Sequence, residues 1–329
     1  MKRAAIIHYT DRGAETAQRI AQAMQDEFAV EQYRSKCCME ALFSAVDALV
    51  FVGATGIAVR AIAPHLKSKT SDPAVVVADE RGINVISLIS GHIGGANALT
   101  RKIAERIGAY PVITTATDVN QRFAVDEWAA KREIWMNSMQ AAKRFAMEIL
   151  KRDLPLSTGF PVRGSLPNGI FRADEGEFGM RVSVRDDSPF KNTLHLVPRI
   201  VHLGIGCKRG TSAEAIEEAL REALSAQKLS IEAIKTVASI DVKQNEAGLL
   251  AFCDAHRWPV QFFSAEELAK VEGEFTASAF VRRTVGVDNV CERAAMMAAG
   301  AGGRLIVRKT CISGVTIAAA QEEWSVCFE

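Results

Sequence analysis

The chain lacks an excess of either charge sign: its 329 residues include 40 Lys and Arg against 39 Asp and Glu, a formal net charge of +1. Proteins that bind the nucleic-acid backbone normally carry a clear basic excess, so the sequence predicts no nucleic-acid partner. It also lacks any apolar run near the roughly 20 residues of a membrane-spanning helix. The apolar stretch after its basic N-terminus is too short for a signal peptide. We therefore expect a cytoplasmic protein without a membrane partner.

Motifs of several enzyme classes are also missing. The seven cysteines form no CxxC pair and are odd in number, which favours reduced thiols over a disulfide framework or a structural zinc site. There is no GxxxxGK[ST] phosphate loop, no HExxH and no GxSxG elbow. The sequence therefore gives no support to three enzyme classes: nucleoside-triphosphate enzymes, zinc proteases and serine hydrolases.

What the sequence does contain is an alternation of strand and helix patterns, which is typical of α/β proteins. Ala48–Val52 is a continuous apolar run, the pattern of a strand buried on both faces of a parallel sheet. The other elements predicted for the N-terminal part are strands at 4–9, 74–78, 84–89 and 111–115 and helices at 14–28 and 96–107.

The same alternation restarts near residue 200, after a stretch rich in Pro, Gly, Asp and Ser. The elements predicted there are strands at 200–205, 234–240, 260–263, 305–308 and 314–320 and helices at 212–226 and 287–299. The length suits roughly two domains. We predict an α/β fold: two α/β domains with mainly parallel sheets, at 1–130 and 198–329, joined by a small irregular or antiparallel connector at 131–197.

Polar residues gather in the loops between residues 53 and 118, directly after strand candidates. Loops beyond the carboxyl ends of parallel strands converge on one crevice, so together these residues predict a polar site, although each loop alone also fits ordinary turn chemistry. The candidates for ligand binding in this part are Gly53, Thr55, Gly56, Arg60, Asp72, Gly91, Gly94, Gly95, Asn97, Thr114, Thr115 and Asp118.

Four residues of these loops are candidates for catalysis. His92 lies among glycines just before a helix, and an imidazole titrates near neutrality, so it can serve as general acid or base. Asp79 and Glu80 form a carboxylate pair at a strand end, and one of them could act as the base. Lys69 could stabilise an oxyanion. The alternative for each is a solvated loop residue.

A second cluster follows the strand at 200–205. Gly204, Gly206 and Gly210 form GxGxxxG, a loosened dinucleotide fingerprint, and Lys208 and Arg209 add positive charge. No acidic residue follows at the distance needed to hold a ribose, so a carboxylate-rich ligand is favoured over a nucleotide. Other residues expected to contribute to this crevice are Thr211, Glu292 and Lys309.

These motifs together resemble the cobalt-precorrin-5A hydrolase family of anaerobic cobalamin biosynthesis. The N-terminal resemblance rests on GATGIAVR, DPAV, SGHxGGAN and TTATD between residues 53 and 118, and the C-terminal one on GxGCKRG at 204–210 and on 290–295 and 314–318. The matching regions cover about two thirds of the chain; the first fifty residues and the stretch 131–197 match only in length and general pattern.

The resemblance implies a cobalt-bearing tetrapyrrole with a δ-lactone on ring A as substrate. Water would open the lactone, acetaldehyde would leave and cobalt-precorrin-5B would result. The C-terminal domain is similar to a small stand-alone protein of the aerobic pathway. This implies that the N-terminal domain hydrolyses and the C-terminal domain binds the corrinoid. The substrate brings the metal, so we expect no cofactor and no metal site of the protein's own, and neighbouring enzymes of the pathway are candidate partners.

The chemistry of the loops agrees with this reaction. Lactone hydrolysis needs a base for water, donors for the oxyanion and an acid for the departing group. Two alternatives stay open: a non-catalytic corrinoid carrier, and a dinucleotide-dependent oxidoreductase built on GxGxxxG.

Overall fold

The computed structural model describes residues 1–35, 38–68, 71–279, 283 and 286–328. The chain forms two compact units. Unit 1 comprises Met1–Lys131 with Ala146–Arg152, and unit 2 comprises Arg132–Phe145 with Asp153–Glu329. Lys69 lies outside the described residues. Within the described ranges, no helix is long and apolar enough to cross a membrane.

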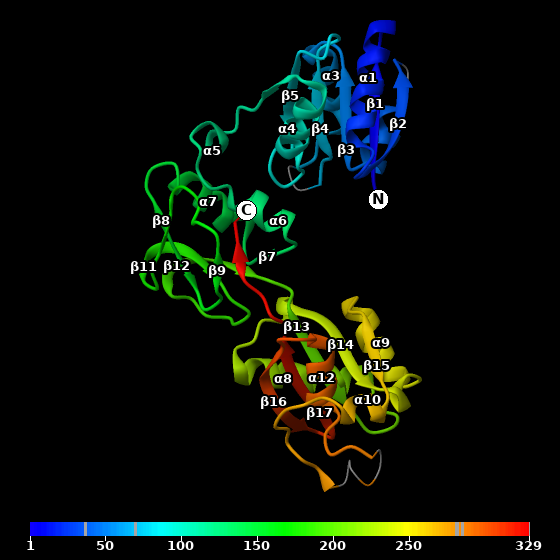
Figure 1. Ribbon diagram of the computed structural model, residues 1–329, viewed down its shortest axis with the longest axis vertical. Helices are drawn as coiled ribbons and strands as arrows, with labels where there is room; N and C mark the ends of the chain where they lie inside the picture. The colour runs from blue at the N-terminus through cyan, green and yellow to red at the C-terminus, as the bar shows by residue number, and fades with distance from the viewer. Residues whose placement is uncertain (36–37, 69–70, 280–282, 284–285, 329) are drawn as a thin grey trace. The chain divides into compact units, whose positions relative to one another are not determined.

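Unit 1 contains one six-stranded sheet with the order β2-β1-β3-β4-β5-β6 (Figure 1). Its strands are β1 (Lys2–His8), β2 (Phe28–Arg34), β3 (Ala48–Val52), β4 (Ala74–Ala78), β5 (Asn84–Ile89) and β6 (Tyr110–Val112). Its helices are α1 (Asp11–Met24), α2 (Met39–Ala45), α3 (Thr55–Ile62), α4 (Ala96–Ile107), α5 (Ala116–Val119) and α6 (Val125–Lys131). Neighbouring strands are parallel except β4 and β5, which are antiparallel.

Helices cover both faces of this sheet, which makes a three-layer core. Alternate residues of a strand point to opposite faces: Ala4 and Ile6 of β1 pack with α1 and α4, whereas Ala5 and Ile7 pack with α2 and α3. The strand β3 is buried along its whole length, as its continuous apolar run predicts.

A short turn reverses the chain between β4 and β5. The carboxylate of Asp79 closes it by accepting hydrogen bonds from the backbone N–H groups of Arg81 at 2.9 Å and Ile83 at 3.1 Å. Gly82 supports the turn with φ +65°. Because of this reversal, the loops after β5 and β6 open at the amino ends of β1, β3 and β4, opposite the loops after β3 and β4.

The middle region differs from the predicted connector because it forms a sheet of its own. Five strands lie in the order β10-β8-β11-β12-β7, and only the β12–β7 pair is antiparallel. The elements are β7 (Trp135–Met136), α7 (Met139–Glu148), β8 (Leu154–Thr158), β9 (Val162–Arg163), β10 (Ile170–Arg172), β11 (Gly176–Val182) and β12 (Phe190–Val197). Buried residues such as Leu154 and Leu156 give this sheet a core, which the many turn residues obscured. The predicted irregular connector is therefore wrong.

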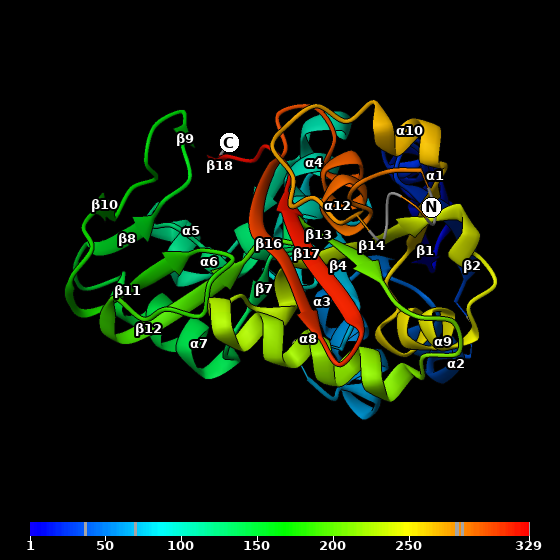
Figure 2. The same ribbon diagram turned by 90° about the horizontal axis from the view of Figure 1, so that it is seen from below.

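The last part of unit 2 contains a second five-stranded sheet with the order β15-β14-β13-β17-β16. Its strands are β13 (Val201–Gly206), β14 (Ile234–Ile240), β15 (Val260–Phe263), β16 (Arg304–Ile312) and β17 (Val315–Gln321). Its helices are α8 (Ala213–Gln227), α9 (Ala247–His256), α10 (Ala265–Ala269) and α12 (Cys291–Ala299). In Figure 2, α12 and α8 lie on opposite faces of the sheet. The α/β class with mainly parallel sheets is confirmed.

The end of the chain returns to the middle region within unit 2. The short strand β18 (Val326–Cys327) pairs in parallel with β9. Next to it, the rings of Phe160 and Trp324 lie edge to face with centroids 4.8 Å apart.

The first glycine of GxGxxxG serves helix packing. A Cβ atom on Gly204 would lie 1.7 Å from the carbonyl oxygen of Cys291 and 3.0 Å from the nitrogen of Ala295. Helix α12 therefore packs directly on the backbone of β13, and only glycine leaves room for it.

Replacing Gly204 by Ala should lower the free energy of unfolding of unit 2 by roughly 3 kcal/mol, because the helix must move away from the sheet. Urea unfolding followed by circular dichroism measures the change. Gly159→Ala is the matched control, since no atom lies within 4 Å of its added methyl group. Equal stability of the two variants would contradict the packing role of Gly204.

Candidate active site

A pocket of about 620 Å³ lies at the amino edge of β1–β4, and we call it the amino-edge pocket. Its wall includes the starts of β1, β2 and β4 and the loop from His92 to Gly95 that follows β5. Lining residues with ionisable side chains are Lys2, Glu27, Asp47, Asp72, His92, Lys102, Glu127 and Lys131.

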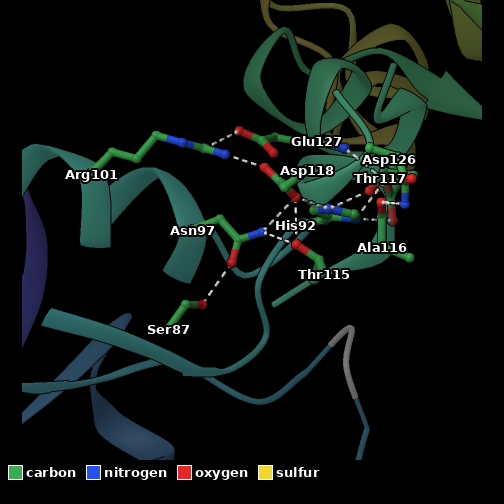
Figure 3. Close-up of polar contacts among 11 residues, drawn as sticks. Ser87, His92, Asn97, Arg101, Thr115, Ala116, Thr117, Asp118, Asp126 and Glu127 are labelled. Carbon is green, nitrogen blue, oxygen red and sulfur yellow. Dashed lines mark hydrogen bonds and ion pairs between the residues drawn. The ribbon is translucent and has the colours of Figure 1, made fainter. Parts of the chain in front are cut away.

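His92 is held between two carboxylates in this wall (Figure 3). Its Nε2 lies 3.0 Å from Oδ2 of Asp118, and its Nδ1 lies 3.1 Å from Oδ1 of Asp126. All three side chains are largely buried, with 15%, 11% and 10% of their surfaces exposed. The imidazole therefore has a carboxylate acceptor at each ring nitrogen, which favours the protonated form.

The charges around His92 change its acid–base role. Burial by itself lowers the pKa of His92, but the hydrogen bonds and negative charges of Asp126 and Asp118 outweigh it and raise the pKa to about 9. The pKa of Asp118 is lowered: burial raises it, but hydrogen bonds from Thr115, His92 and Arg101 dominate. At neutral pH the ring is an imidazolium, which suits an acid or an anion-stabilising group better than a base.

Asp118 is fixed by further donors. Asn97 Nδ2 donates to its Oδ2 at 3.0 Å, Thr115 Oγ1 donates to the same oxygen, and Arg101 donates to Oδ1. Asn97 is itself oriented by Ser87 Oγ, which donates to Asn97 Oδ1 at 2.7 Å. Of the predicted site residues, the structure therefore brings together His92, Asn97, Thr115 and Asp118, with Asp72, Gly94 and Gly95 in the pocket wall.

Ligand atoms of His92, Asp118 and Glu127 lie within 4.8 Å of one another, close enough in principle to hold a metal ion. The contacts favour another interpretation. Both ring nitrogens of His92 already face carboxylates, and Arg101 holds Asp118. We interpret the group as an ionic hydrogen-bond network with two cations and three carboxyl groups.

The glycines of SGHxGGAN mostly shape the loop. A Cβ on Gly91 would lie 2.8 Å from Asn97 Oδ1, and one on Gly94 would lie 2.4 Å from the Cβ of Ser90. Ser90 has φ +58°. Only Gly95, with φ +84°, faces open space. Gly91 and Gly94, two of the predicted ligand-binding residues, are therefore needed as glycines because an added Cβ would collide with Asn97 or Ser90.

Asp79 and Glu80 lie at the opposite edge of the sheet from His92. They follow β4, so the six residues of β5 separate them from His92, about 20 Å of extended chain. Asp79 closes the turn, and Glu80 Oε1 accepts a 2.6 Å hydrogen bond from Thr10. The prediction of one crevice for His92 and Glu80 is wrong.

Several other predicted residues are not part of the His92 network. Four of them follow β3, at the edge of the sheet that holds Glu80: Gly53, Thr55, Gly56 and the exposed Arg60. Thr114 is exposed after β6.

The carboxylate of Asp72 serves its own loop. It accepts from the backbone N–H groups of Lys67 at 3.0 Å and Ser68 at 3.2 Å.

Unit 2 holds a second pocket, of about 850 Å³, above the carboxyl ends of β13 and β14, and we call it the cationic pocket. Gly206, Lys208, Arg209 and Lys309 line it, as predicted, together with the apolar Ile240, Val242 and Val290. Val242 is 67% exposed. The chain of Lys208 packs 3.3 Å from the Cβ position of Gly314 in the β16–β17 turn, which places its charge at the pocket.

The expectation that Glu292 contributes to this pocket is wrong, and Gly210 also has a structural role. The backbone N–H of Gly210 is not free for a ligand, because it donates to Glu246 Oε1 at 2.6 Å. Glu292 is fully buried and accepts from the backbone N–H groups of Thr276 and Lys309, both at 2.6 Å, so it holds the fold together.

Two further side chains of this loop, those of Thr211 and Cys207, are hydrogen-bonded or unreactive. Thr211 Oγ1 donates to the carbonyl of Lys208 at 2.9 Å. Burial raises the pKa of the Cys207 thiol, which argues against a reactive thiolate.

Sequence reasoning missed Arg101, Asp126 and Glu127. Asp126 and Glu127 stand in the first turn of α6, where acidic residues are common because they suit the helix dipole. Their one sequence signal is their position within ten residues of Asp118.

Replacing Asp126 by Asn should bring the pKa of His92 down from about 9 toward its ordinary value, because one of the two charges that hold the proton is gone. Nitrogen-detected NMR of the imidazole rings in the full chain measures this pKa. Asp47→Asn, in the same pocket wall but hydrogen-bonded to the Arg3 backbone, is the control and should leave it unchanged. An unchanged His92 pKa in Asp126→Asn would contradict the described network.

Comparisons with known proteins agree with this arrangement of motifs. A family model described as Cobalamin synthesis G N-terminal matches residues 37–118, and one described as Cobalamin synthesis G C-terminus matches residues 201–320. A cobalt-precorrin-5A hydrolase from Salmonella typhimurium is 42% identical over 289 residues, covering 84% of this chain and 82% of that protein. One from Priestia megaterium is 31% identical over 304 residues, covering 86% and 80%.

Two further similarities concern part of the chain and a solved structure. Protein CobE from a Sinorhizobium species is 32% identical over 119 residues, which is 36% of this chain and 77% of that protein. A crystal structure of a cobalamin biosynthesis protein G homolog from Sulfolobus solfataricus matches 97% of both chains with 25% identity and a TM-score of 0.44. The resemblance seen in the sequence motifs is confirmed by the family models and the two hydrolases: the chain belongs to the cobalt-precorrin-5A hydrolase family.

Proposed function

We propose that this protein hydrolyses the ring-A δ-lactone of cobalt-precorrin-5A, releasing acetaldehyde and giving cobalt-precorrin-5B. Membership of a family of cobalt-precorrin-5A hydrolases supports the substrate. The observation that carries the proposal is the ionised His92, held by Asp118 and Asp126 in the wall of the amino-edge pocket. The cobalt belongs to the substrate, and we propose no cofactor.

The pocket supplies what the lactone carbonyl needs. An imidazolium in a water-poor wall stabilises the negative charge that develops on the carbonyl oxygen. It can also protonate the departing ring oxygen if its Nε2–H turns from Asp118 to the substrate, while Asp126 keeps hold of Nδ1. The first turn of α4, whose Gly95 and Ala98 line the pocket, adds the partial positive charge of a helix N-terminus.

The cationic pocket suits recognition of the tetrapyrrole. A corrinoid precursor has an apolar ring face and a rim of carboxylates. Ile240, Val242 and Val290 offer an apolar surface, and Lys208, Arg209 and Lys309 offer cations beside it. We therefore assign substrate recognition to unit 2 and hydrolysis to unit 1.

The oxidoreductase alternative has lost its structural basis. Gly204 packs against α12, and the Gly210 N–H is bonded to Glu246, so neither of these two glycines serves a phosphate as in a dinucleotide fingerprint. The carrier alternative is separated from the enzyme by the experiment that follows.

The full-length protein, incubated with the lactone substrate, should release acetaldehyde. His92→Gln should cut that rate by roughly 10²–10⁴, since it removes the charge and the proton. Glu80→Gln is the matched control at the opposite edge of the sheet and should keep close to the parent rate. Corrinoid binding without acetaldehyde release by the parent protein would identify a carrier.

Replacing Lys208 and Arg209 together by Ala should weaken corrinoid binding, by about 1–3 kcal/mol for each charged hydrogen bond lost. Absorbance titration measures the affinity. Arg199→Ala with Lys270→Ala removes two exposed cations of unit 2 outside the cationic pocket and should not change it. If both double variants bind like the parent, Lys208 and Arg209 are solvated surface residues.

A further inference from the structure

The amino-edge pocket has four carboxylates in its wall, and three of them serve the fold. Glu27 Oε1 accepts from Lys102 Nζ at 2.6 Å, and Asp47 Oδ2 accepts from the backbone N–H of Arg3 at 2.7 Å. Asp72 accepts from two backbone N–H groups of its own loop. Their lone pairs are committed, and none lies in the His92 network.

The fourth carboxylate, Glu127, is different. Its nearest charged partner among the described residues is Arg101, whose Nη1 is 3.9 Å from Oε1, beyond hydrogen-bond distance. Its side chain is 27% exposed, and its oxygen lies within 4.8 Å of the ligand atoms of His92 and Asp118. In Figure 3, Glu127 and Asp118 both point toward Arg101.

We propose that Glu127 is the general base of lactone hydrolysis and that His92 is the matching general acid, with Asp126 as its positioning residue. This inference rests on the proposed function and names the residues that move protons in it. It replaces the expectation that His92 or Glu80 is the base.

A water molecule gives one proton to the Glu127 carboxylate while its oxygen forms a bond to the lactone carbonyl carbon. The tetrahedral oxyanion then collapses and the bond from the carbonyl carbon to the ring oxygen breaks. The departing oxygen takes the Nε2 proton of His92, which gives up its hydrogen bond to Asp118, while Asp126 stays bonded to Nδ1. Glu127 is left protonated and His92 neutral, and return of one proton from Glu127 to His92 restores both groups. Acetaldehyde leaves after this step: the freed alcohol loses its proton and becomes a carbonyl, its C–C bond to the macrocycle breaks, and the macrocycle carbon takes up a proton.

The environment of Glu127 fits this cycle. Burial raises its pKa, opposed by the charges of Arg101 and His92 and reinforced by those of Asp118 and Asp126. A carboxylate with a raised pKa is a stronger base than a free one. The environment of His92 thus keeps the acid protonated at neutral pH, and burial makes Glu127 a stronger base than a free carboxylate.

The test is the pH dependence of acetaldehyde release by the full chain. The parent should give a bell-shaped profile: activity falls as pH drops through the pKa of Glu127, and falls again as pH rises through about 9, where His92 loses its proton. Glu127→Gln should lower kcat by roughly 10²–10⁴, abolish the acidic limb and leave corrinoid affinity unchanged. Glu105→Gln, on the exposed side of α4, is the matched control and should behave like the parent.

Glu127→Asp distinguishes the loss of a general base from a disturbance of the fold. It keeps a carboxylate at a shorter reach, so it should retain the acidic limb at a reduced rate. The inference is overturned if Glu127→Gln turns over within about fivefold of an active parent, or if it keeps the acidic limb. A parent that binds corrinoid but releases no acetaldehyde contradicts the proposed function itself, which distinguishes the two failures.

Discussion

A five-residue turn closed by the carboxylate of Asp79 decides on which edge of the N-terminal sheet the site forms. It reverses the chain between β4 and β5, so β5 and its parallel neighbour β6 deliver their loops to the amino ends of the other strands. Those loops carry His92 and Asp118. If β5 ran parallel to β4, the same residues would lie beside Glu80, and the amino-edge pocket would have no histidine.

Within that pocket, neighbouring charges determine which side chains are protonated. Asp118 and Asp126 hold a proton on His92, while Arg101 and three other hydrogen-bonded neighbours, His92, Asn97 and Thr115, keep Asp118 ionised. Burial raises the pKa of both Asp118 and Glu127, but only at Asp118 do hydrogen bonds outweigh it, so the pKa of Glu127 is raised. This network thus contains a protonated histidine, His92, and a carboxyl group with a raised pKa, Glu127. An ester hydrolysis requires such a pairing of acid and base.

Much of the fold follows from local patterns in the sequence. Ala48–Val52, Ala74–Ala78 and Asn84–Ile89 form strands where their apolar runs predict them, and Ala96–Ile107 is a helix. The missed strand β2 has an exposed, mixed pattern at the edge of the sheet. The middle sheet was missed because many turn residues separate its strands.

The site was harder to predict because it depends on strand direction. Parallel neighbours need a crossover of a dozen or more residues. The short connection between β4 and β5 therefore predicts antiparallel pairing, and the prediction of one crevice for His92 and Glu80 did not take this into account. Glu127 and Asp126 come from a helix start whose acidic residues fit the helix dipole, so nothing in their spacing marks them. Glycines in these motifs can serve close packing as well as ligand binding. Gly91, Gly94 and Gly204 pack closely against Asn97, Ser90 and Cys291, and the sequence alone does not show these contacts.

The central claim is that ring A of the tetrapyrrole reacts at the amino edge of the N-terminal sheet. A crystal structure of Glu127→Gln with unreacted substrate tests it most directly. We predict that the lactone carbonyl lies within hydrogen-bond distance of His92, in the pocket that Gly95 and Ala98 line. A lactone bound instead at the opposite edge, beside Glu80 and Thr10, would contradict the account.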